Sequence, residues 1–89
     1  MNSIWKYPLL IQRNQTVTIP MNSHLLVAQL QHGVVCLWVR VDKEKKETET
    51  INILMVGTGH DIPEDFLSHL GTVQLEEGTL VLHIFEVVE

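Results

Sequence analysis

Short segments in which apolar and polar positions alternate make up most of the chain, and polar or glycine-containing turns separate them. These segments are rich in β-branched and aromatic side chains, a composition typical of strands. We therefore expect a mainly β protein, a small single-domain antiparallel sandwich or barrel of about six to seven strands over residues 1–89. The predicted strands are IWKYPL, QTVTIP, HLLVAQLQ, VVCLWVRV, TINILMVG, TVQLEE and TLVLHIFEVV.

A hairpin is predicted at the centre of the chain, because His32-Gly33 fits a two-residue turn in which glycine takes a positive φ at little cost. Counting outward from this turn pairs Leu30 with Val35, and alternate positions then share one apolar face. We assign that face to the core. Its members are Leu26, Ala28, Leu30, Val35, Leu37 and Val39.

The other face of the same hairpin is mixed. It pairs Val27 with Trp38 and Leu25 with Arg40. Tryptophan and arginine are over-represented at binding hot spots. Val27, Trp38 and Arg40 are therefore candidate interface residues.

A second hairpin is predicted with Glu77-Gly78 as its turn, which places Val73 in the core. On the opposite face Thr72 meets His83, and Phe85 continues that face. The mixed faces contain too many apolar residues to be fully exposed to solvent. The N-terminal segments, the 63–70 stretch or another subunit should cover them, so closure within the monomer and self-association remain alternatives. His83 and Phe85 join the candidate interface.

The stretch GTGHDIPEDF, Gly57–Phe66, combines glycines with polar groups and follows a predicted strand. Asp61 and Glu64 have the spacing of a helix N-cap and its N3 partner, and Pro63 is tolerated in the first helical turn. This pattern predicts a bend followed by one short helix near residues 63–69. The acids of this segment would repel a phosphate, so the loop is a poor phosphate cradle.

The same loop holds the candidate chemistry of the chain: Thr58, Gly59, His60 and Asp61. A hydroxyl, an imidazole and a carboxylate resemble a catalytic set, but such sets are assembled from distant chain positions rather than from adjacent residues. Histidine and cysteine spacings typical of metal sites are missing from the sequence. We expect no catalytic residue, no metal and no cofactor, and keep a small enzyme using Gly57–Asp61 as an alternative.

Charge and composition exclude several classes of protein. The net charge is −5, and no Lys/Arg cluster is interleaved with aromatic residues, so generic nucleic-acid binding is not expected. The sequence contains neither an apolar run near 18 residues nor a signal-peptide pattern, which predicts no membrane association and a cytoplasmic location. Cys36, the single cysteine, lies in VVCLWV and is expected to be a buried, unreactive thiol.

Five segments, IWKYPL, CLWV, GTGHDIP, LGTVQL and LVLHIFE, occur in this order across nearly the whole chain. Together they resemble a family of small proteins of unknown function from phages and prophages. The chain departs from that pattern in a longer and more charged loop over Asp42–Thr50. The resemblance implies a viral context and transfers no catalytic residues.

These observations lead to one expected function and two alternatives. We expect a non-enzymatic, self-associating phage or prophage accessory protein that antagonises a host defence system by binding a host protein or a small signalling nucleotide. The alternatives are a minor virion or assembly protein and the small enzyme described above. Small domains bury a limited share of their surface, so a homo-oligomer would add stability.

Overall fold

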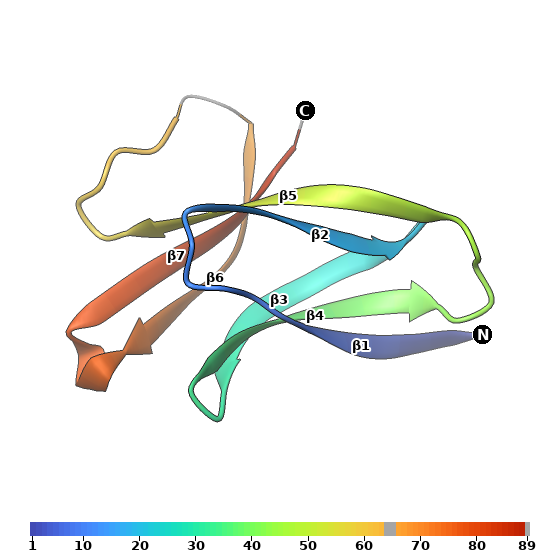
Figure 1. Cartoon of the computed structure of the whole chain (residues 1–89), viewed down its shortest axis with the longest axis horizontal. Coiled ribbons are helices and arrows are strands. Elements are labelled where there is room, and N and C mark those ends of the chain that lie inside the picture. Colours follow the sequence, from blue (N-terminus) through green and yellow to red (C-terminus); the bar gives the residue numbers. More distant parts are fainter. Residues whose placement is uncertain (64–65, 89) are drawn as a thin grey trace.

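A computed structural model describes residues 1–63 and 66–88 and shows seven strands in two antiparallel sheets (Figure 1). The elements are β1 (Asn2–Pro8), β2 (Asn14–Pro20), β3 (His24–Gln31), β4 (Val34–Asp42), β5 (Thr48–Gly57), β6 (Leu67–Leu75), the single-turn 3₁₀ helix η1 (Glu76–Gly78) and β7 (Leu80–Val87). The expected mainly β sandwich is confirmed. Within the described residues, no helix is long and apolar enough to cross a membrane.

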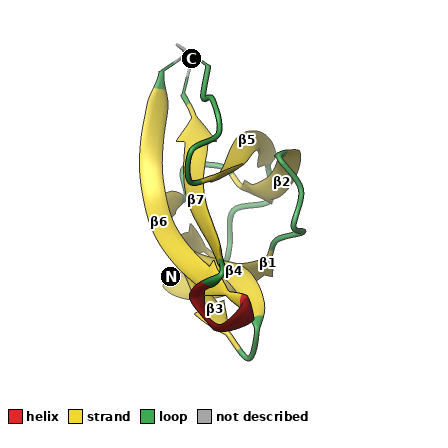
Figure 2. Ribbon diagram, turned by 90° about the vertical axis from the view of Figure 1, so that its left-hand side faces the viewer, coloured by secondary structure: helices red, strands yellow, loops and turns green. Residues whose placement is uncertain are grey.

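The strands form an open sandwich. The three-stranded sheet has the order β1-β4-β3, and the four-stranded sheet has the order β2-β5-β7-β6. Figure 2, which looks along the molecule from one side, shows the two sheets as separate layers. The layers approach closely where β3 meets β6, whereas β1 and β2 are the edge strands farthest from that seam.

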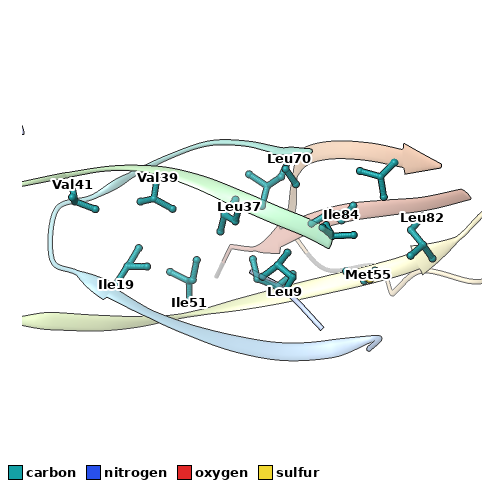
Figure 3. Packing of buried hydrophobic residues seen from close by; sticks show 14 residues of the cluster. Leu9, Ile19, Leu37, Val39, Val41, Ile51, Met55, Leu70, Leu82 and Ile84 are labelled. Atoms are coloured by element: carbon teal, nitrogen blue, oxygen red, sulfur yellow. The ribbon is translucent and has the colours of Figure 1, made fainter. Parts of the chain in front are cut away.

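The core fills the space between the inward faces of the two sheets. Ile19 and Ile51 of the four-stranded sheet point toward Val39 and Val41 of the three-stranded sheet (Figure 3). Leu9, from the linker after β1, is also buried in this layer. Each such side chain contributes about 1.5–3 kcal/mol when it leaves water, so this layer is the main source of stability.

The predicted central hairpin is confirmed. His32 and Gly33 both have a positive φ, 52° and 77°, as a two-residue turn of the hairpin type requires. Val27 pairs with Trp38 as expected, and the register holds from there to the turn. Leu30, which the pattern assigns to the core, lies beside the turn and is 37% exposed, so that assignment is wrong.

A β-bulge in β3 makes the observed register differ from the predicted one in the part of the hairpin farther from the turn. The pairing shifts between Leu25 and Val27, so Leu25 pairs with Val39 and packs against the core. Leu26, which the alternating pattern predicts to be in the core, is the extra residue of the bulge and is 47% exposed, so that prediction is wrong. The predicted pairing of Leu25 with Arg40 is likewise wrong, because His24 occupies that position.

The second hairpin has the predicted register, with Val73 opposite Leu82 and Thr72 opposite His83. Its turn is wider than predicted and includes η1. The short helix expected near residues 63–69 is wrong at its described positions, because β6 begins at Leu67 and pairs with β7 instead. Residues 64 and 65 lie outside the described residues, and the first of them is Glu64, the predicted capping partner of Asp61.

Candidate functional site

The structure separates the candidate residues onto two surfaces. Val27, Trp38 and Arg40 lie on the outer face of the three-stranded sheet. His83 and Phe85 lie on the outer face of the four-stranded sheet, because Leu82 and Ile84, which alternate with them along β7, belong to the core.

The first surface is centred on Trp38, and we call it the Trp38 face: Lys6, Val27, Gln29, Trp38 and Arg40. Lys6 and Val27 are the cross-strand neighbours of Trp38 on its two sides. Trp38 is half-buried and Arg40 is exposed. The Nζ atom of Lys6 donates a hydrogen bond of 2.7 Å to the side-chain oxygen of Gln31 on β3, so the lysine stem lies across the strands. An aromatic side chain thus stands between two cations.

Charge is unevenly divided between the two sheets. Strands β1, β3 and β4 contain Lys6 and Arg40 and a single acid, Asp42, at the end of β4. The backbone N–H of Glu44 donates to Asp42 Oδ1 and is the main reason why the pKa of that carboxyl lies below its ordinary value. Most other acids follow residue 48 in the sequence. The Trp38 face is therefore a basic surface on an acidic protein.

The second surface is built partly by the loop after β5. A tight turn begins it, in which the backbone N–H of His60 donates to the carbonyl of Gly57 at 3.1 Å and Gly59 has a φ of 89°. A side chain at Gly57 would press on the His60 ring, and the positive φ of Gly59 favours glycine, so the turn itself explains both glycines. Arg13 Nη2 donates to the carbonyl oxygen of Asp61 at 2.7 Å and ties the loop to the linker before β2.

A chain of hydrogen bonds links this loop to the outer face of the four-stranded sheet. Thr58 Oγ1 lies 2.7 Å from His83 Nε2, and His83 Nδ1 lies 3.1 Å from Thr72 Oγ1. Thr72 Oγ1 in turn lies 3.1 Å from His69 Nε2. The His69 ring meets Phe85 edge-on, with ring centroids 5.3 Å apart. We call Thr58, His83, Thr72 and His69 the hydroxyl–imidazole chain.

A hollow of about 210 Å³ opens beside the first member of that chain. The residues around it include the apolar Val56, Ile62 and Phe85 and the polar Thr58, His60 and His83, and most of its lining surface is apolar. The structure thus brings together five of the candidate residues around one space: Thr58, Gly59, His60, His83 and Phe85. Asp61 is exposed.

A larger hollow of about 640 Å³ lies over β2 and β5 and is lined by amide side chains such as Gln12 and Gln15. Those amides already hold the linker before β2. Gln15 donates to the carbonyls of Leu10 and Gln12, and Gln12 donates to the carbonyl of Asn14. Their hydrogen bonds have a structural role, so the smaller hollow is the better candidate for a ligand site.

Chemically, the pair of Thr58 and His83 resembles a nucleophile beside a base. The other ring nitrogen of His83 contacts a threonine hydroxyl, where catalytic triads place a carboxylate that stabilises the imidazolium. This arrangement is better suited to hydrogen bonding than to proton abstraction. Among residues 1–63 and 66–88, no group of three or more His, Cys, Asp and Glu side chains could hold a metal ion.

The pairing of Thr72 with His83 is confirmed, but sequence reasoning missed two contributors: Lys6 beside Trp38, and His69 as the further link from Thr72. His69 and Thr72 are three positions apart, which in a regular strand puts side chains on opposite faces. A bulge between His69 and Gly71 brings them onto the same face. The glycine at position 71 was the available signal, since an isolated glycine in a strand often marks a bulge. Cys36 is buried, as expected.

Over residues 1–89 the chain matches a family model described as a domain of unknown function (DUF7352), and it belongs to that family. No curated protein and no solved structure matches the chain significantly.

Proposed function

We propose that this protein is a non-enzymatic binding module that docks an acidic segment of a partner protein on its Trp38 face. The main support for this proposal is that the half-buried Trp38 is flanked by the cations Lys6 and Arg40, on a protein with a net charge of −5. Tryptophan and arginine are the side chains that most often dominate binding energy. Complementary charge would guide an acidic partner to this sheet and away from the acidic remainder.

The biological setting is a further part of the proposal. The resemblance to phage and prophage proteins supports a viral setting, and by analogy with other small viral binding proteins we propose an accessory protein whose partner is a host defence protein. The alternative is a minor virion or assembly protein. Mass spectrometry of purified virions separates the two, because an accessory protein is absent from the particle and a virion protein is present in it.

Binding to the Trp38 face can be tested with a labelled glutamate-rich peptide that contains one aromatic residue, with a lysine-rich peptide of equal length as the control. We expect saturable fluorescence anisotropy for the acidic peptide only, and weaker binding as salt rises. Arg40→Gln should weaken binding about tenfold or more, equivalent to about 1.4 kcal/mol. The matched control, Lys46→Gln, removes a cation from the Asp42–Thr50 loop and should change the affinity little.

Three outcomes would contradict the proposal. The two variants could bind alike, which would make the attraction non-specific. The lysine-rich peptide could bind as well as the acidic one. The third is a mass that rises with protein concentration and falls in Arg40→Gln, which would identify a second copy as the occupant.

A further inference from the structure

We infer that the hollow beside Thr58 is a second, independent binding site, which takes an uncharged planar heteroaromatic ring such as a nucleobase. Its volume of about 210 Å³ lies below the roughly 300–1,000 Å³ of sites for drug-sized ligands, so it suits a single ring system. The turn from Gly57 to His60 carries the chain back over the sheet, and Ile62 then forms a wall together with Val56.

The walls favour a flat, apolar body. Phe85 and the His60 ring both border the hollow, and aromatic side chains bind rings by stacking or edge-on contact. Stacking on aromatic side chains also accepts any nucleobase, because each base has a π face. The lining residues include neither lysine nor arginine, so the hollow provides no fixed cation for a phosphate.

The hydroxyl–imidazole chain determines which polar groups can bind there. A neutral imidazole has one N–H donor and one acceptor nitrogen, and each threonine hydroxyl has one proton. The chain can therefore be polarised in two directions. In the first, Thr58 donates to His83 Nε2, and His83 Nδ1–H donates to Thr72, which donates to His69.

In the second direction, donor and acceptor are exchanged in each of these hydrogen bonds. His69 donates to Thr72, Thr72 donates to His83 Nδ1, and His83 Nε2–H donates to Thr58. The Thr58 hydroxyl then offers its own proton to the hollow, whereas in the first direction it offers only lone pairs. One hydroxyl can thus meet either an acceptor or a donor on the ligand. Heteroaromatic rings such as nucleobases carry both a donor and an acceptor on one edge. The Thr58 hydroxyl, at the end of the hydroxyl–imidazole chain, can recognise either group.

The test uses adenine as the probe, followed by NMR of the ¹⁵N-labelled histidine rings, whose shifts report which nitrogen carries the proton. We expect saturable shifts in His83 and also in His69, which reports through the chain. Thr58→Val should weaken adenine binding at least tenfold. Thr18→Val is the matched control, because Thr18 lies on the same sheet face and does not line the hollow.

Thr72→Val tests the chain itself: adenine should still shift His83, but the response of His69 should disappear. Ile62→Glu provides a second test of the site at a wall residue that is 50% exposed, and it should abolish binding in a folded protein. Both variants are checked by their backbone amide spectra.

The inference is overturned if adenine gives no saturable shift, if Thr58→Val binds as well as Thr18→Val, or if His69 still responds in Thr72→Val. Toluene binding with adenine excluded would show an apolar hollow without polar recognition. Binding of inorganic phosphate, or of adenosine monophosphate but not adenine, would show an anion site. Arg40→Gln should bind adenine like the wild type, so this site and the Trp38 face can fail separately.

Discussion

Gly71 lies where the two sheets come closest. A Cβ atom built at this position would collide with the backbone carbonyl of Ala28 on β3. Gly71→Ala should therefore destabilise the fold by about 1–3 kcal/mol or more, because the backbone of one sheet must shift. Gly33→Asn is the control, since Gly33 has a positive φ, open space around it and a turn position that asparagine tolerates. Urea unfolding measures both, and an unchanged midpoint for Gly71→Ala would show that the seam can open.

Glu86 is a half-buried carboxyl on β7, cross-strand from Ile53. Burial, and secondarily the charge of Glu49, raise its pKa above the ordinary value of 4.5. The folded state then binds the proton more tightly than the unfolded state, so stability falls as the pH rises above about 4.5 through the folded pKa. Glu86→Gln should raise the unfolding midpoint at pH 7, and this gain should vanish as the pH falls below 4.5.

The control for that change is Glu47→Gln, at an exposed position in the loop before β5. Thermal melts at pH 4 and pH 7 give the comparison. If Glu86→Gln and Glu47→Gln shift the midpoint equally at pH 7, the buried carboxylate does not weaken the fold.

The two β-bulges, in β3 and β6, determine which side chains of these strands face the core. The bulge in β3 leaves Leu26 nearly half exposed, whereas Leu37 is fully buried on β4. Leu37→Ala should cost about 2–5 kcal/mol, the range for buried leucines, and Leu26→Ala should cost less than about 1 kcal/mol. Chemical unfolding of both variants tests this. Equal losses would mean that β3 is regular and that Leu26 is in the core.

Turn-based pairings were predictable from the sequence, and pairings between distant strands were not. His32-Gly33 specifies its hairpin because the backbone conformation of the turn fixes the register nearby. The pairings of β1 with β4 and of β2 with β5 join segments far apart in sequence, and no local pattern records them. Bulges add one residue without interrupting the apolar pattern, so a period of two misplaced Leu26 and concealed the contact between His69 and Thr72.

The sequence indicated which residues are candidates for a site, but not which of them lie together in the fold. Glycines and polar residues identified the loop around Thr58, and the cross-strand pair of Thr72 and His83 followed from the second hairpin. The loop and the strand meet because the backbone N–H of Thr58 donates to Val81 on β7 and extends the pairing of β5 with β7. That contact depends on the order of strands in the sheet, which the sequence alone does not specify.

The sandwich is open on the side away from the seam of β3 and β6. Large apolar side chains are exposed there on β1 and its linker: Trp5 is 40%, Leu10 65% and Ile11 59% exposed. Lys6 and Pro8 on edge strand β1 oppose the addition of another strand. Self-association should therefore use side-chain contacts between copies rather than a continuous sheet.

We expect the mass measured by light scattering to rise with protein concentration. Ile11→Asp should return the mass to that of one chain while the circular dichroism spectrum stays unchanged, because a charge at a dry contact between copies costs several kcal/mol. Val34→Asp is the matched control: Val34 is 43% exposed, next to the hairpin turn at His32-Gly33 and outside the β1 linker, and this change should leave the association intact. A wild-type mass that equals one chain at every concentration would mean that the open side faces solvent, and the core between the sheets would then supply the stability of this fold without a second copy.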